Sequence, residues 1–135
     1  MITGGKGKFA LIEQTYTNKP GLSFFSYHIP ISKQSKNKIR KDASKKIIQE
    51  RVINLGEDRK KYFDGNLEIE LNFGMDAGRK ETKTTDIDNL VKHTLDCLKG
   101  VLFKDDKQIR ALHAYKHIVD KGTSDCTGIR IRKLE

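Results

Sequence analysis

Alternating apolar and polar residues predict two strands in the first part of the chain. Residues 22–31 are rich in aromatic side chains, which favour extended structure, and Pro30 ends the segment. Residues 66–73 carry an apolar side chain at every second position, namely Leu67, Ile69, Leu71 and Phe73. Because side chains alternate between the two faces of a strand, this segment is predicted to be half-buried, with its polar side chains facing water.

Apolar residues at three- and four-residue steps predict two amphipathic helices. The first contains Ala43, Ile47, Ile48, Val52 and Leu55. Asp42 is its candidate N-cap, and Gly56 marks its end. The second extends from near Thr85 to Gly100, and its first four residues, Thr85 to Asp88, match the capping-box pattern [ST]-x-x-[DE].

The remaining segments connect these elements or close the sheet. Residues 32–41 are predicted to form a basic loop and residues 74–84 a second loop. The apolar residues 101–103 are expected to return along the second helix as a short strand, and residues 108–118 and 127–133 to form two closing strands. The order strand, helix, strand, helix, strands predicts an α/β (α+β) fold, with two main helices packed on a mixed β-sheet.

Length and composition restrict the class of protein. The 135 residues correspond to one domain, and a 36% hydrophobic content supports one modest core and excludes a disordered chain. Apolar runs no longer than residues 9–12 exclude a membrane span, and no secretory signal peptide is recognisable. Cys97 and Cys126 form no disulfide framework, so both are expected to be reduced, in an intracellular protein. His93 is expected at the surface or at an interface.

The positive charge is concentrated in the first half of the chain. Residues 1–61 hold 14 Lys and Arg against 5 Asp and Glu, which gives the whole net charge of +9, whereas residues 62–135 hold 13 of each. Such a surface attracts a polyanion, and nucleic acid is the commonest one inside a cell. On charge alone, a lysine-rich surface that only maintains solubility is equally consistent with the sequence.

The candidate catalytic residues are five charged side chains in the second half of the chain, which has no net charge. Asp86 and Asp88 begin the second helix, Lys92 lies one turn beyond Asp88, and Asp105 and Asp106 follow about twenty residues later. Three Asp carboxylates around one point suit Mg²⁺ or Mn²⁺, which prefer oxygen ligands. Asp86 and Asp88 can share an ion only if Asp86 lies at the helix boundary. The alternative is that these residues serve as ordinary helix-cap and turn residues.

A sequence pattern extends these residues into a longer motif. The segment Asp86-Ile87-Asp88-Asn89-Leu90-Val91-Lys92 is followed by Gly100-Val101-Leu102-Phe103-Lys104-Asp105-Asp106-Lys107-Gln108-Ile109. Together they resemble the RusA family of Holliday junction resolvases, whose hallmark is D-x-D-N-L-x-K and then G-[apolar]₃-x-D-D-x-Q-[apolar]. The resemblance implies a RusA-like fold over residues 21–135, preceded by a partly flexible N-terminal extension at residues 1–20.

The resemblance also implies a function and a site. It implies a metal-dependent endodeoxyribonuclease that resolves four-way DNA junctions in recombination and repair, as a homodimer in the cytoplasm of a bacterium or encoded by a prophage. Asp86, Asp88 and Asp106 would hold Mg²⁺, with Mn²⁺ also supporting activity, and Lys92 would be the essential lysine. Asp105 is the alternative to its neighbour Asp106.

Six cations are candidates for contacts to the DNA backbone: Lys33, Lys36, Lys38, Arg40, Lys80 and Lys83. Two alternatives to a junction resolvase remain open at the level of the sequence. One is a nuclease of the same chemistry that acts on flaps or forks. The other is a non-catalytic basic protein that binds nucleic acid and uses its aspartates only as caps.

Overall fold

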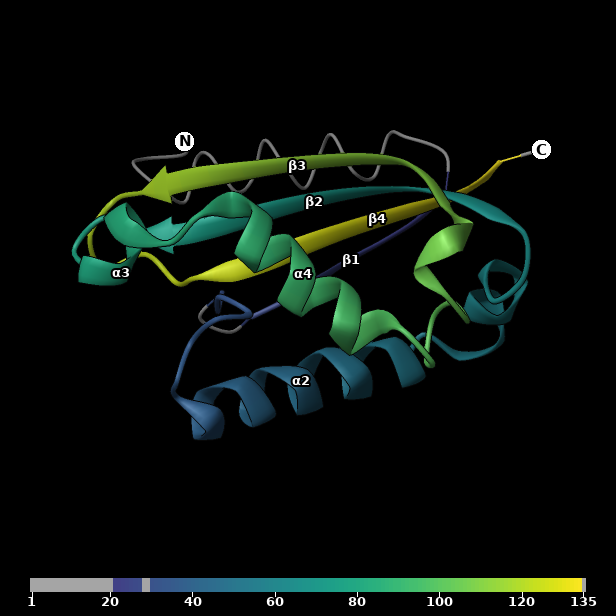
Figure 1. The fold of residues 1–135 in the computed structure, drawn as a ribbon, viewed down its shortest axis with the longest axis horizontal. Coiled ribbons are helices and arrows are strands. Elements are labelled where there is room, and N and C mark those ends of the chain that lie inside the picture. The colour runs from purple at the N-terminus through teal and green to yellow at the C-terminus, as the bar shows by residue number, and fades with distance from the viewer. Residues whose placement is uncertain (1–20, 28–29, 135) are drawn as a thin grey trace.

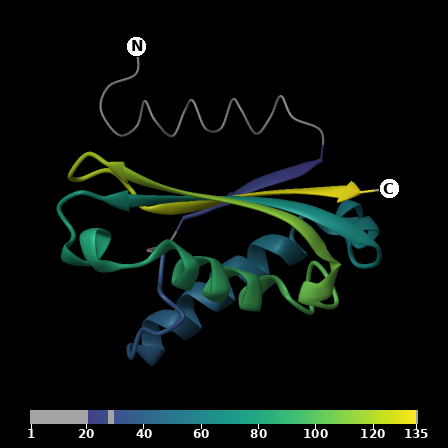
Figure 2. The same cartoon turned by 45° about the horizontal axis from the view of Figure 1, so that its top comes forward.

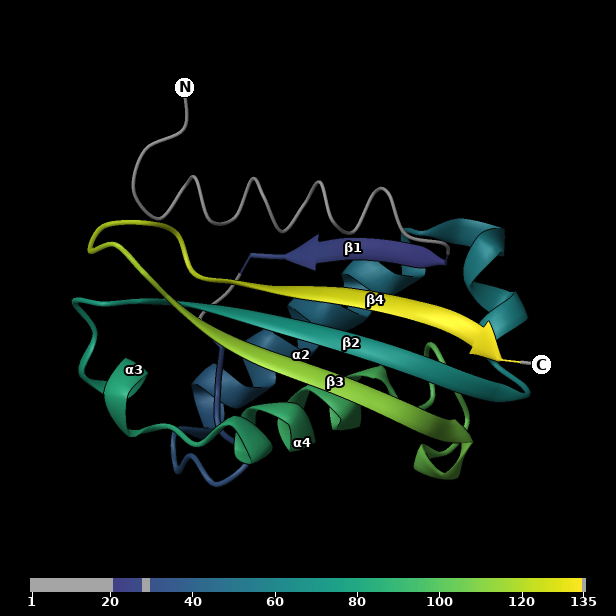
Figure 3. The same cartoon turned by 90° about the horizontal axis from the view of Figure 1, so that it is seen from above.

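A four-stranded mixed sheet forms the centre of the protein (Figure 1). The computed structural model describes residues 21–27 and 30–134, so the predicted extension at residues 1–20 lies outside the described residues. The strands are β1 (Leu22–Ser26), β2 (Asn66–Asp76), β3 (Ile109–Val119) and β4 (Cys126–Leu134), in the spatial order β1-β4-β2-β3 (Figure 3). Strand β4 is antiparallel to both of its neighbours, whereas β2 and β3 are parallel.

Two long helices cover one face of this sheet (Figure 2). They are α2 (Lys38–Ile53) and α4 (Ile87–Leu98), and they are accompanied by a short helix α3 (Lys80–Thr84) and two 3₁₀ turns, η1 (Gly56–Tyr62) and η2 (Asp106–Gln108). The predicted mixed sheet with two main helices is therefore confirmed. None of the described helices has the length and the apolar content that crossing a membrane requires.

The hydrophobic core lies between the sheet and the helices. The apolar side chains of β2 that the alternation identified, Leu67, Ile69, Leu71 and Phe73, are all fully buried. They belong to one cluster with Ile48 and Val52 of α2 and with Leu90 and Leu98 of α4. Burying each such side chain contributes about 1.5–3 kcal/mol, so this cluster fixes both helices on the sheet.

The polar face of β2 differs from the prediction. The strand extends to Asp76, and Glu70 and Asn72 are only 7% and 4% exposed, so the half-buried description is wrong. Arg130 of β4 donates from Nη2 to Oε1 of Glu70 at 3.2 Å, and Nε2 of His117 lies 2.6 Å from Oδ1 of Asn72. Buried polar groups are tolerated when they are paired, and neighbouring strands supply the partners here.

Helix α2 begins earlier than its apolar spacing indicated. Asn37, rather than Asp42, is the N-cap, and its side chain accepts a hydrogen bond from the backbone N–H of Arg40 at 3.1 Å. Asp42 therefore lies inside the helix. Of the predicted basic loop 32–41, residues 32–37 remain outside the helix and residues 38–41 form its first turn. The helix ends at Ile53, a few residues before the expected stop at Gly56.

The other predicted boundaries agree with the structure to different degrees. Strand β1 ends at Ser26, short of the predicted 22–31, and residues 28–29 lie outside the described residues. Strands β3 and β4 confirm the two predicted closing strands to within one or two residues. The predicted loop 74–84 instead contains the end of β2 and helix α3.

Helices α2 and α4 also meet through a polar contact. Nε2 of His93 on α4 lies 3.0 Å from Oγ of Ser44 on α2 and 3.6 Å from Sγ of Cys97. His93 is only 5% exposed, so the expectation that it lies at the surface is wrong. Burial, together with the positive charge of Lys41, lowers the pKa of His93 to about 4, and the ring is neutral at pH 7. Both cysteines are free, as expected, and both are buried.

This buried histidine predicts a loss of stability in acid. Its pKa is lower in the folded protein, at about 4, than the value of about 6.5 in an unfolded chain. The contribution of the neutral ring to the free energy of unfolding is therefore nearly complete above pH 6.5, and about 3 kcal/mol of it is lost as the pH falls to 4. His93→Gln, which keeps a hydrogen-bonding group opposite Ser44 but does not titrate, should flatten this dependence in urea unfolding at pH 7, 5.5 and 4.5.

The control is Asn66→Gln, a non-titrating exchange at the exposed start of β2 that leaves His93 in place. This variant should retain the wild-type dependence on pH. An unchanged slope in His93→Gln would show that another group carries the sensitivity to acid.

Candidate active site

The connection between α3 and α4 presents Asp86 at a helix boundary. Asp86 is the N-cap of α4, with an extended backbone (φ −76°, ψ 142°). The predicted capping box headed by Thr85 is therefore wrong, because Thr85 ends α3 and lies outside α4. Nζ of Lys116 on β3 donates to the carbonyl of Thr85 at 2.8 Å, which ties this junction to the sheet. The condition for Asp86 and Asp88 to share an ion, that Asp86 leaves the helical path, is met.

The side chains of Asp86, Asp88 and Lys92 are available for binding. All three are exposed, and within the described part of the chain none of them has a hydrogen bond or ion pair. Asp at an N-cap usually accepts a backbone hydrogen bond from its own helix, yet the Asp86 carboxylate makes none. A capping role therefore does not account for this aspartate.

The second acidic segment lies in η2, immediately before β3. Asp105 is the N-cap of η2, and its carboxylate accepts from the backbone N–H of Lys107 at 2.9 Å. That hydrogen bond lowers the pKa of Asp105 below its usual range. Asp106 is exposed and makes no such contact in the described structure. Of the two neighbours, Asp106 is the one whose carboxylate is free to bind an ion.

Gln108 fixes the position of η2, a role that the sequence pattern did not reveal. Its Oε1 accepts from the backbone N–H groups of Lys104 at 2.7 Å and Asp105 at 2.9 Å. Its Nε2 donates to the carbonyls of Phe63 and Gly65, both at 2.9 Å. The glutamine of the motif thus anchors the acidic turn to the segment that leads into β2.

The two acidic segments do not meet within one chain. The segment after α4 does not return as a strand: residues 101–103 form a turn closed by a hydrogen bond from the N–H of Gly100 to the carbonyl of Phe103 at 2.7 Å. Gly100 adopts the left-handed backbone (φ 87°) that ends helices. In Figure 1, η2, the light green turn ahead of β3, lies at the opposite end of α4 from the first turn of that helix. Among residues 21–27 and 30–134, no three His, Cys, Asp or Glu side chains cluster closely enough to hold a metal ion.

Most of the candidate DNA-binding cations surround the end of the sheet where Asp86 lies. Lys80 and Lys83 are exposed on α3, and Lys38 and Arg40 are exposed in the first turn of α2, with Lys36 just before it. The first turn of α2 contains no acidic residue, although the helix dipole favours acids there. Cations placed against the dipole indicate a surface that serves an external anion rather than the helix itself.

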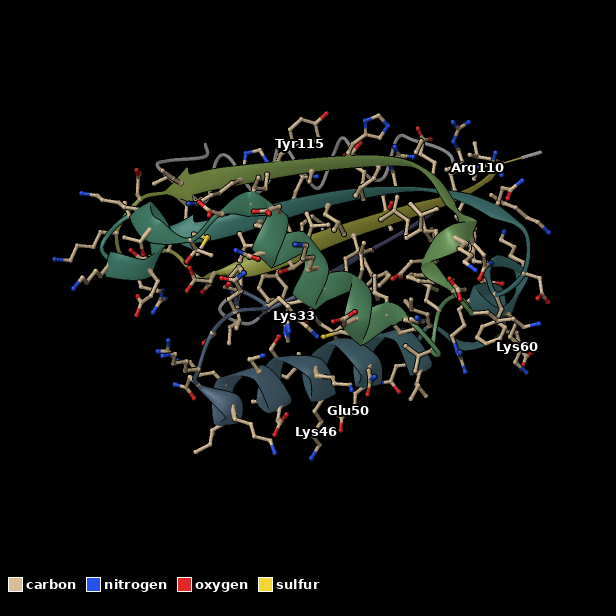
Figure 4. All side chains as sticks on the ribbon, in the orientation of Figure 1. Lys33, Lys46, Glu50, Lys60, Arg110 and Tyr115 are labelled. Carbon is tan, nitrogen blue, oxygen red and sulfur yellow. The ribbon has the colours of Figure 1, made fainter. Side chains whose placement is uncertain are left out.

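Lys33 is committed to a contact within the protein. Its ammonium group pairs with the carboxylate of Asp96, and its backbone N–H donates to the carbonyl of Asn89 at 2.9 Å. Figure 4 shows Lys33 between α2 and α4. The pair is half-exposed and is worth little in water, but it occupies a side chain that the sequence assigned to DNA.

Asp86 also lines a cavity of about 330 Å³, which the sequence did not reveal. The cavity lies between the loop that begins at Pro30, the first turn of α2 and the α3–α4 junction. Across it, Nη1 of Arg40 and Oε1 of Glu81 are 4.0 Å apart.

The turn from β2 into α3 is held by two aspartates. Asp76 accepts from the backbone N–H groups of Gly78 at 2.7 Å and Gly122 at 3.0 Å, and these hydrogen bonds lower its pKa. Asp125, which is 8% exposed, pairs with Arg79 at the N-cap of α3. These contacts fix α3, and through it the position of Asp86.

Comparison with known proteins identifies the family of the chain. The family model described as Endodeoxyribonuclease RusA matches residues 24–132, which is most of the chain. No curated protein sequence matches the chain. The matched region includes all three candidate aspartates, Lys92 and the anchoring Gln108. The chain therefore belongs to the RusA endodeoxyribonuclease family, whose members are nucleases that resolve Holliday junctions.

Proposed function

We propose that the protein cuts four-way DNA junctions as a homodimer whose two active sites each combine residues of both protomers. In each site, Asp86 and Asp88 of one protomer and Asp106 of its partner would hold Mg²⁺ or Mn²⁺. The observation that carries this proposal is the position of Asp106 at the far end of α4 from the other two aspartates. A second copy of the chain supplies the missing carboxylate where one copy does not.

Strand β3 is the candidate dimer interface. Among the described strands it pairs only with β2, which leaves it at the edge of the sheet. Leu112 and Tyr115 on this strand are 42% and 48% exposed, and Figure 4 shows Tyr115 on the side of β3 away from the helices. Long edge strands with exposed apolar side chains invite pairing with another chain.

The direction of β3 makes this interface suitable for a shared site. A two-fold axis pairs identical edge strands in antiparallel fashion, so the start of one β3 lies beside the end of the other. Asp106 immediately precedes the start of β3, and Lys116, near its end, binds the residue before Asp86. The same pairing therefore moves the Asp106 of one protomer toward the Asp86 of the other at both ends of the interface.

The residues present suit a hard divalent cation. Asp86, Asp88 and Asp106 offer exposed, uncommitted carboxylate oxygens. Held by these three carboxylates, a divalent ion would supply an activated water for phosphodiester hydrolysis and positive charge opposite the charge that develops on the phosphate. Lys92, one turn from Asp88 on the same helix, would contact the phosphate under attack and stabilise its added negative charge.

The cationic surface would hold the arms of the junction. Lys36, Lys38, Arg40, Lys80 and Lys83 are assigned to phosphate contacts, which position DNA without reading its sequence. Lys33 would join them only after leaving Asp96. A nuclease of this kind acts where the chromosome is, so we place it in the cytoplasm of a bacterium or among the products of a prophage.

A cleavage assay tests the substrate and the metal. With Mg²⁺, the protein should cut a four-way junction and leave a flap, a fork and a linear duplex largely intact. EDTA should lower the rate by about 1,000-fold or more while junction binding persists, because the ion supplies several kcal/mol of transition-state stabilisation. Equal cutting of flaps or forks would favour the nuclease of that class, and binding without any cutting would favour the non-catalytic alternative.

Mixed dimers test whether each site is shared between protomers. Asp88→Asn and Asp106→Asn should each abolish cutting, by about 1,000-fold, and retain junction binding. When equal amounts of these two variants are refolded together, half of the dimers contain one chain of each, and each such dimer has one intact site. The mixture should therefore contain about a quarter of the intact sites of the wild-type protein. The readout is a junction nicked in one strand only.

The matched control mixes Asp86→Asn with Asp88→Asn. Both substitutions fall in the same half of the proposed site, so every mixed dimer carries two defective sites and no activity should return. If the first mixture also stays inactive after mass spectrometry confirms mixed dimers, the three carboxylates do not act across the interface.

The interface itself is tested at Leu112. Leu112→Asp places charge on the edge of β3 and should give a monomer in analytical ultracentrifugation that no longer cuts, with an unchanged far-UV circular dichroism spectrum. Ile53→Asp is the control, because Ile53 is 52% exposed on α2 and lies away from β3. A dimeric Leu112→Asp, or a monomeric Ile53→Asp, would place the interface elsewhere.

A further inference from the structure

The cavity beside Asp86 has the size and position of a binding site next to the reacting phosphate. Its volume of about 330 Å³ is at the lower end of the range of small-ligand pockets, roughly 300–1,000 Å³. Asp86, the proposed metal ligand, forms part of its wall, as do Arg40 and Glu81. DNA that follows the cations of α2 and α3 to Asp86 therefore passes over its mouth.

The lining of the cavity suits an uncharged planar group. Pro30 and Ile31 are buried and provide an apolar wall, and the carboxamides of Gln34 and Asn89 provide hydrogen-bonding groups. Hydroxyl groups from both sides of the cavity, among them Ser35, add further donors and acceptors. Such a combination of apolar surface and a few polar groups is typical of sites that bind and orient a ring.

The charge of the lining argues against a phosphate group inside the cavity. Glu81 and Asp86 both contribute carboxylates, while Arg40 is the one cation among the described lining residues and faces Glu81. An anion would be repelled by this balance, whereas the phosphates find lysines outside, on α3 and before α2. A nucleobase has no charge and meets no such penalty.

Asn89 is the residue that best fits a reading role. Its Oδ1 is buried and lacks a hydrogen-bond partner within the described part of the chain. Its backbone carbonyl is held by the N–H of Lys33, so the side chain starts from a fixed position. Rotation about the last side-chain bond turns either the oxygen or the NH₂ group toward the cavity. A carboxamide of this kind pairs with complementary donors and acceptors on a base edge.

We propose that this cavity takes up one unstacked nucleobase of the cut strand, next to the phosphate that is hydrolysed, and that Asn89 discriminates among bases there. The inference rests on the proposed function, because it takes Asp86 as the position of the reacting phosphate. The free-energy cost of unstacking a base is smallest where base pairing is already disturbed, as it is at the centre of a junction. Holding that base fixes the adjoining phosphate against Asp86 and gives the cut a preference for sequence.

The first experiment follows the base directly. A junction carries 2-aminopurine at one position on either side of the cut, and binding is measured in EDTA, where no strand is cut. Binding should raise the fluorescence several-fold at one of these positions. Thr84→Phe, which fills the cavity from an exposed position on α3, should abolish the rise, lower the cutting rate about tenfold with Mg²⁺ and leave the circular dichroism spectrum unchanged.

The matched control is Ser124→Phe, which adds the same ring at an exposed position outside the cavity lining and should behave as the wild type. The inference is overturned if fluorescence stays constant at every position beside the cut. It is equally overturned if Thr84→Phe and Ser124→Phe give the same fluorescence and the same cutting rate.

The second experiment tests Asn89. Four junctions carry A, C, G or T at the position where the 2-aminopurine signal rises. Their cutting rates should differ by about 5- to 150-fold, the range expected for one good base contact. Asn89→Ala should bring these rates together, whereas Asn66→Ala, at the exposed start of β2, should not. Unchanged discrimination in Asn89→Ala would remove this residue from base selection.

Failure of the active-site assignment would appear differently. Asp88→Asn would then cut the junction at the wild-type rate, whatever the fluorescence shows. If Asp88→Asn is inactive and the 2-aminopurine signal is absent, the metal site stands and the base pocket alone is wrong.

Discussion

Strands β2 and β3 run parallel, and this orientation obliges the chain between them to cross the full length of the sheet. Residues 77–108 make that crossing, and α4 is its longest element. Asp86, at the start of α4, and Asp106, in the 3₁₀ turn ahead of β3, consequently lie at opposite ends of the sheet. The separation of Asp86 from Asp106 follows from the topology and is not a detail of loop conformation.

Helix α4 connects the hydrophobic core to the candidate active site. One side of α4 is buried through Leu90 and Leu98, and a buried polar contact from His93 to Ser44 sets α4 against α2. Its first turn leaves Asp86 and Asp88 exposed beside the cationic ends of α2 and α3. The two aspartates proposed for the active site therefore stand on an element that is packed against the core, which would preserve their geometry when a junction binds.

Local patterns in the sequence predicted most of the elements. Strict alternation identified β2, and apolar spacing identified α2 and α4, because both patterns reflect one face packed on a core. The N-terminus of α2 was missed because Asn37 supplied a better cap than Asp42, and cap geometry is decided by backbone angles that composition does not reveal. The burial of Glu70 was missed because its partner, Arg130, is sixty residues away in the chain.

The residues of the candidate site stay a prediction, and their arrangement in space could not be predicted from the sequence. Capping and turn chemistry are local, and the acidic motif could be recognised from them and from the family pattern. Whether Asp106 reaches Asp86 depends on the relative direction of β2 and β3, which hydrophobic alternation leaves undetermined. The roles of Gln108 and Lys116 were equally hidden, since each binds backbone atoms of a distant segment.

The distance between the two acidic segments has a consequence for control of the enzyme in the cell. Under the proposed division of the site, a newly made chain is harmless to the chromosome, because by itself it lacks a full set of ligands. At low abundance, the amount of competent enzyme rises with the square of the number of chains. The topology of the sheet would thus make nuclease activity depend on dimer formation, and therefore on a sufficient concentration of the chain.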